Sequence, residues 1–113
     1  MTPLVRRHLN AHRRQIKATG EEMTLRRGSG VGAESLAVWG RIMGFDPDEL
    51  VGDIKQGDRK AIILAEDVTF NPPLRPGDRI MLRGQPLNIT AVDDSTRRVG
   101  GMLIAYEVTA RGQ

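Results

Sequence analysis

Two histidines near the N-terminus are the residues best suited to bind a metal. His8 and His12 are four residues apart, so on a helix they share a face, and imidazoles at that spacing can bind zinc. The metalloprotease pattern also places a glutamate directly after the first histidine, where this chain has Leu9. There is no cysteine and no evident third ligand. We therefore expect a solvated basic helix face, with no metal and no cofactor.

Acidic residues occur in groups, which raises the question of acid–base catalysis. A catalytic pair of carboxyl groups needs a pocket that shifts one pKa, and these groups fall in expected turns or at a helix start, where acids serve as caps. The only histidines lie in the N-terminal segment, so a serine or threonine nucleophile lacks a base. We expect that the protein is not an enzyme. The acidic groups are Asp46/Asp48/Glu49, Glu66/Asp67 and Asp93/Asp94.

The charge distribution is the one remaining feature that points to a function. Residues 1–27 hold seven basic and two acidic residues, whereas residues 28–113 hold ten basic and twelve acidic ones. A basic terminal segment can contact the phosphates of DNA, or an acidic surface of a neighbouring subunit. Both readings stay open. The candidate contact residues are Arg6, Arg7, Arg13, Arg14 and Lys17.

These cations need an element to present them, and residues 3–18 read as an amphipathic helix. Leu4, Val5, Leu9 and Ile16 recur at helical spacing. Thr2 fits the N-cap, Pro3 the first helical position and Gly20 the stop signal. Because Arg6–Arg7 and Arg13–Arg14 are seven residues apart, the two pairs fall on nearly the same face, two turns apart.

After residue 20 the pattern changes to the alternation of β-strands. We expect a mainly β fold, a small antiparallel β-barrel of about six strands, with one hairpin turning about Gly84-Gln85-Pro86. We expect one domain over residues 1–113, with a basic helix or arm over 1–20 and a barrel over 21–113. The expected strands are residues 23–27, 36–43, 59–66, 79–83, 87–92 and 102–111.

Residues 44–55 interrupt the short turns with a long loop between strands, and long loops are often functional. The hypothesis is that this loop projects into a channel or onto a partner. Its candidate interface residues are Asp46, Asp48, Glu49, Asp53 and Lys55.

No run approaches the roughly 20 apolar residues of a transmembrane helix, and no apolar stretch follows the first arginines as in a signal peptide. We expect a protein that is made in the cytoplasm and does not contact a membrane.

Two stretches, residues 49–67 and residues 76–93 continuing into 101–112, together resemble the small head–tail connector proteins of tailed bacteriophages. Residues 23–27 and 38–41 fit the same plan. The resemblance covers about residues 22–112 and rests on strands and turns, without a catalytic motif. The basic helix over residues 3–18 departs from the barest version of that family.

The resemblance implies a stopper or head-completion subunit that forms a homo-oligomeric ring in the virion, at the head–tail interface. Such a ring lies below the portal and adaptor, closes the DNA channel after packaging and meets the tail terminator or tail tube. It can also touch the packaged DNA end. Alternatives are a small β-barrel nucleic-acid-binding module, or another neck or tail role such as tail terminator or minor tail protein. A small hydrolase or metal enzyme is disfavoured.

Overall fold

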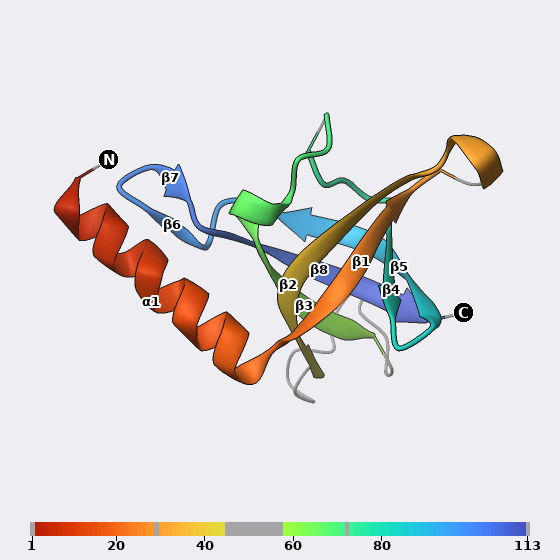
Figure 1. Cartoon of the computed structure of the whole chain (residues 1–113), viewed down its shortest axis with the longest axis horizontal. Helices are drawn as coiled ribbons and strands as arrows, with labels where there is room; N and C mark the ends of the chain where they lie inside the picture. The colour runs from red at the N-terminus through yellow and green to blue at the C-terminus, as the bar shows by residue number, and fades with distance from the viewer. Residues whose placement is uncertain (1, 29, 45–57, 72, 113) are drawn as a thin grey trace.

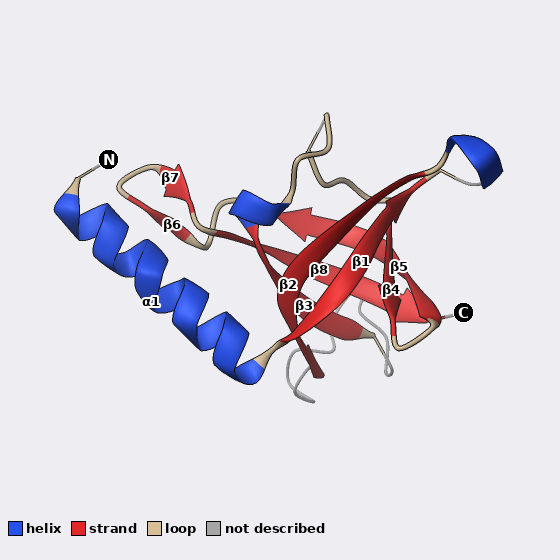
Figure 2. Ribbon diagram, in the orientation of Figure 1, coloured by secondary structure: helices blue, strands red, loops and turns tan. Residues whose placement is uncertain are grey.

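The computed structural model describes residues 2–28, 30–44, 58–71 and 73–112. A helix, α1 (Pro3–Thr19), precedes a closed six-stranded antiparallel barrel, and a separate two-stranded hairpin lies beside the N-terminal half of the helix (Figures 1 and 2). The predicted fold class is therefore confirmed. The barrel strands are β1 (Glu21–Arg27), β2 (Glu34–Gly44), β3 (Arg59–Leu64), β4 (Arg79–Leu82), β5 (Gln85–Asp93) and β8 (Ala105–Gly112).

The barrel strands follow the order β1-β2-β3-β8-β5-β4, and pairing of β1 with β4 closes the ring. Alternation of side chains along each strand sends every second residue inward. In β1 the inward set is Met23, Leu25 and Arg27, all buried. The alternation that predicted this strand from the sequence thus also determines which of its side chains face the barrel interior and which face outward.

The barrel interior holds the main apolar cluster. Strand residues such as Leu25, Ile63 and Ile80 are fully buried there, and Phe70 and Leu74 join them from the loop between β3 and β4. Aliphatic side chains supply most of this volume, as expected from a chain with four aromatic residues. Burial of this surface is the dominant favourable term in folding.

A second, smaller apolar cluster lies outside the barrel and docks α1. Ile16 packs there with Ile62, Leu64 and Ala105, and partly buried Trp39 and Met43 lie against them. Val5 and Leu9 complete the buried stripe of the helix. The helix thus covers the side of the barrel formed by β2, β3 and β8.

The junction between helix and barrel depends on two glycines. Gly20 is the C-cap of α1, as predicted, but its φ of −101° is not left-handed. A Cβ at this position would come within 2.2 Å of the carbonyl oxygen of Gly40. A glycine is needed here because two backbones approach closely, which a helix-stop signal in a sequence does not reveal.

The hairpin between β4 and β5 turns earlier than predicted. Arg83 and Gly84 form the turn, with φ values of 50° and 80°, whereas Gln85 and Pro86 belong to β5. Two residues with positive φ give a turn whose twist matches that of the strands. Pro86 is tolerated because the pairing of β5 with β8 begins only at Leu87.

The predicted closing strand over residues 102–111 is broken in two. Met102–Leu103 forms β7, which pairs with β6 (Arg98–Val99) around the Gly100–Gly101 turn, and β8 starts at Ala105. Ile104 lies between them: its amide donates to Arg97 and its carbonyl accepts from Ala65. These two bonds divert the chain from β7 into the barrel.

Two smaller departures concern strand ends. The strand predicted over residues 59–66 ends at Leu64, because Ala65–Asp67 forms a 3-10 turn whose Asp67 accepts the backbone N–H of Trp39. The glycine-rich loop after β1 contains a further 3-10 turn, Gly30–Gly32.

Candidate functional site

The outer face of α1 presents most of the predicted contact residues. Arg6, Arg7, Arg14 and Lys17 are exposed and lie away from the buried stripe of the helix. Within the described part of the chain, none of these four makes a hydrogen bond or an ion pair. The helix contains no acidic residue. The outer face of the helix is therefore basic over about three turns, and of these four cations Lys17 lies near enough to an acid, Glu66, to lower the pKa of that carboxyl.

Arg13 differs from the other four cations because it is bound within the chain. Its Nε and Nη2 donate to the carboxylate of Glu66 over 2.7 and 2.5 Å, and Nη1 donates to Asn10. This hydrogen bond, together with the charge of Arg13, holds the pKa of Glu66 below its usual range. Arg13 thus joins the helix to the turn that follows β3, and its guanidinium is occupied by contacts within the chain.

A shallow hollow brings three of the predicted cations together. It has a volume of about 690 Å³ and is lined, among the described residues, by Asn10, Arg13, Arg14, Lys17 and Ala18. An anion in this hollow would meet the free guanidinium of Arg14 and the ammonium of Lys17. Arg6 and Arg7 lie nearer the N-terminus of the helix, outside the lining.

The two histidines of α1 are joined through the backbone. His12 Nδ1 lies 2.9 Å from the carbonyl oxygen of His8; a carbonyl only accepts, so this nitrogen is the donor and carries the proton. Among the residues that the structure describes, no group of three or more acidic, histidine or cysteine side chains is placed to hold a metal ion.

The predicted interface residues of the long loop, Asp46, Asp48, Glu49, Asp53 and Lys55, lie outside the described residues. Their positions stay a prediction.

A second cleft, of about 460 Å³, lies beside the hairpin of β6 and β7, with Tyr106 in its lining. Tyr106 is 7% exposed, and its hydroxyl has no hydrogen-bond partner in the described chain. Burial raises the pKa of Tyr106 above its ordinary value. The other lining residues are Pro73, Leu74, Arg75, Pro76, Val92, Asp94, Arg98 and Leu103.

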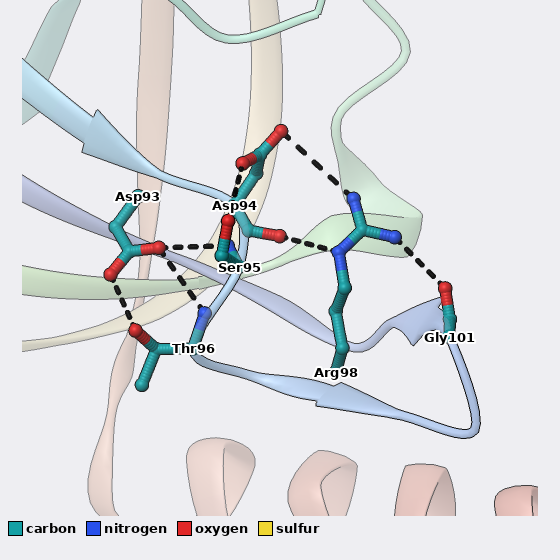
Figure 3. Close-up of polar contacts among 6 residues, drawn as sticks. All are labelled: Asp93, Asp94, Ser95, Thr96, Arg98 and Gly101. Atoms are coloured by element: carbon teal, nitrogen blue, oxygen red, sulfur yellow. Dashed lines mark hydrogen bonds and ion pairs between the residues drawn. The ribbon is translucent and has the colours of Figure 1, made fainter.

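Hydrogen bonds within the turn after β5 hold one wall of this cleft (Figure 3). Arg98 donates to the backbone carbonyls of Asp94 and Gly101, over 2.7 and 2.9 Å. Asp93 accepts from the hydroxyl and amide of Thr96 and from the amide of Ser95, which together lower the pKa of Asp93. The acids at this turn thus serve the local backbone, as their sequence context suggested.

Sequence reasoning missed a buried ion pair at one end of the barrel. Arg27 donates to both carboxylate oxygens of Asp78, over 2.9 and 2.8 Å, and to the carbonyl of Pro73. Its guanidinium also lies 4.5 Å from the ring centre of Phe70. The only signal in the sequence was that Arg27, a charged residue, falls at an inward position of β1. Because Arg27 is also the last residue of that strand, the alternation of side chains suggested only that the strand ends there.

Among the described residues, the hydroxyls of Ser95 and Thr96 donate to the carboxylates of Asp94 and Asp93 at an exposed turn. No described helix is both long and apolar enough to cross a membrane. Neither a family model nor a curated protein matches the chain.

Proposed function

We propose that the chain is a head–tail connector subunit of a tailed bacteriophage, a stopper that forms a ring in the virion. The observation that carries the proposal is the combination of a small closed barrel with a docked helix whose free cations all face outward. A barrel of this kind is what the resemblance over residues 22–112 implies. A connector needs surfaces for its neighbours rather than a catalytic pocket, and so we propose that it is not an enzyme.

In this proposal the barrel forms the body of the ring, and neighbouring copies meet through different surfaces of each, as ring closure by rotation requires. The outer face of α1 is directed to the packaged DNA end or to an acidic face of the portal–adaptor complex. The opposite side of the ring meets the tail terminator or tail tube. Contacts between Arg or Lys and phosphate are independent of sequence and weaken with salt.

Deleting the gene and imaging the lysate by negative-stain microscopy tests the proposal. We expect leaking or filled heads beside free tails. Normal infectious particles, or heads that never assemble, would reject a role at the head–tail junction. Mixing each defective part with wild-type partners then locates the defect. Heads that fail with wild-type tails indicate a stopper, whereas tails that fail with wild-type heads indicate a tail terminator or minor tail protein.

The role of α1 is tested by replacing Arg7 and Arg14 with Gln, leaving Arg13 in place because it holds the helix to the barrel. The matched control removes the same charge from the barrel, at Arg41 and Arg83. We expect genome retention or ring docking to fall in a salt-sensitive way only in the α1 variant. Equal behaviour of the two variants would remove α1 from the contact.

A nucleic-acid-binding module is the second candidate, favoured by the free cations along α1 and by the hollow at Arg14 and Lys17. If this candidate is right, the isolated protein should bind DNA or RNA with an affinity that falls steeply as the salt concentration rises. A connector subunit is expected to bind free DNA weakly. Fluorescence anisotropy with a labelled DNA duplex, measured at salt concentrations from about 50 to about 200 mM, distinguishes the nucleic-acid-binding module from the connector subunit.

A further inference from the structure

A row of hydrogen-bond donors crosses the outer surface of the barrel, from the start of β2 over β1 and β4 to β5. Strands β4 and β5 lie on the side of the barrel away from α1 (Figure 1). In the strand register, Ser35 of β2 lies opposite Arg26 of β1, Arg26 opposite Arg79 of β4, and Arg79 opposite Asn88 of β5. Each alternates with residues that face the interior, so all four project outward. We call these four residues the arginine row.

Both arginines of the row lack a counter-charge. Neither Arg26 nor Arg79 forms a hydrogen bond or an ion pair with any described residue. The acid next to Arg79 in the chain, Asp78, faces inward, and both of its oxygens are bound by Arg27. The acid nearest to Arg26 in the chain is Glu22, four residues earlier in β1. The outward neighbours Thr24 and Met81, which also lie opposite one another, are uncharged.

Like charges directly opposite one another destabilise a pair of strands. Two other arginines of the barrel show how readily such a charge is compensated: Arg83 meets Glu21 over 2.7 Å, and Arg111 meets Asp58 over 2.9 Å. Repulsion between two side chains that no neighbouring acid offsets lowers stability locally, and such destabilising positions are typical of binding sites.

We propose that the arginine row docks an extended acidic segment of a partner protein. Strands in a sheet are about 4.8 Å apart, so the row spans about 14 Å. Same-side residues of an extended segment repeat every 6.6–6.8 Å, roughly twice the rise per residue, so three alternate residues cover the row. Guanidinium groups bind carboxylates through two parallel hydrogen bonds, while Ser35 and Asn88 supply neutral donors at the two ends.

The surroundings of the row favour localised carboxylates over a nucleic acid. Next to Asn88 lies Arg111, which is already bound by Asp58, and the adjacent turn holds the Arg83–Glu21 pair. A polyanion running past the two arginines would meet these acids. The row also contains no aromatic residue on which a base could stack. The outer face of α1, with no acid along the helix, shows the contrasting pattern. The row is a second surface, separate from that of the proposed connector contact on α1.

The test uses the full chain and a labelled peptide, acetyl-Gly-Glu-Thr-Glu-Thr-Glu-Gly-amide, with a Gln-for-Glu peptide as control. We expect Arg26→Gln and Arg79→Gln each to weaken binding roughly tenfold, the loss of one charge-assisted contact. The matched variant Arg83→Gln removes the same charge nearby and is expected to leave binding unchanged. Chemical-shift changes at Arg26 and Arg79, recorded by NMR, would locate the peptide on the row.

A stability measurement keeps the proposal falsifiable even for a weak complex. Arg79→Glu places an acid opposite Arg26, so the isolated protein is expected to melt roughly 2–4 °C higher while losing the peptide. A lower melting temperature would overturn the proposal, because the two arginines would not then repel. No binding at millimolar peptide would overturn it, as would equal binding of the Gln peptide, an equal loss in Arg83→Gln, or displacement by single-stranded DNA at lower concentration than peptide.

Discussion

The barrel interior and the interface under α1 are built from the same two components, yet in different proportions. Each joins an apolar cluster to an arginine–carboxylate pair. In the interior the cluster draws on all six strands, and the side chains of Arg27 and Asp78 are 9% and 3% exposed. At the interface the cluster is smaller, and the side chains of Arg13 and Glu66 are 39% and 34% exposed.

The difference indicates where stability resides. A buried carboxylate that loses its partner leaves a charge in a medium of low dielectric, whereas an exposed one returns to water at little cost. The barrel is therefore expected to hold its shape largely without α1. In the proposed function the helix is a peripheral element that displays its outer cations, and its contacts need only position it.

The largest effect is expected at the interior pair. Asp78→Asn leaves the Arg27 guanidinium buried without its carboxylate, and we expect a loss of about 3–5 kcal/mol in the free energy of unfolding. Urea denaturation followed by circular dichroism measures it. A loss below about 1 kcal/mol would show that solvent reaches the pair and that the contrast with the interface is wrong.

The two apolar clusters are compared by trimming one isoleucine in each. Ile63 is fully buried inside the barrel, and Ile16 is 4% exposed under the helix. We expect Ile63→Ala to cost about 3–5 kcal/mol, and Ile16→Ala about 2 kcal/mol, because a helix on one face can shift to refill the space. Only Ile16→Ala is expected to lose helical signal at low urea. Equal losses in one shared transition would mean that helix and barrel unfold as a unit.

The junction between the two regions is expected to tolerate substitution poorly, although Gly20 is only partly buried. Gly20→Ala forces a methyl group against the carbonyl of Gly40, and the required backbone shift is expected to cost about 1–3 kcal/mol. Gly44→Ala is the matched control, since a Cβ there meets nothing within 4 Å. Equal melting temperatures for the two variants would show that the junction relaxes freely.

Periodicity predicted both regions but not what joins them. Alternation predicted the strand β1, and helical spacing gave Val5, Leu9 and Ile16, because both follow from local geometry. The same spacing also selected Leu4, which is exposed. The pairing of Arg27 with Asp78 spans 51 residues and depends on the closure of the barrel. The Arg13–Glu66 pair likewise spans 53 residues.

The candidate surfaces divide in the same way. The outward cations of α1 were predicted because a helix places residues seven apart on one face. The arginine row could be found only from the register of β1, β4 and β5. Predicting that register requires the exact position of each turn, and an error of one or two residues in a turn shifts the register. The shortened turn at Arg83 and Gly84 is an example of such a shift.

The smallest effect, and the one that most sharpens the comparison, concerns pH at the interface. Because hydrogen bonds from Arg13 hold the folded-state pKa of Glu66 below its ordinary value of 4.5, the ionised carboxylate favours the folded protein. That contribution is fully present above pH 4.5 and disappears as the pH falls through the folded-state pKa. The wild-type protein is therefore expected to melt slightly above Glu66→Gln at pH 7, and the two melting curves should converge as the pH falls below the folded-state pKa of Glu66. Arg13→Gln should close the same gap, and adding Glu66→Gln to it should change nothing further if the pair acts as one unit. A difference that persists at low pH would mean that Glu66 stabilises the docked helix through packing rather than through its charge.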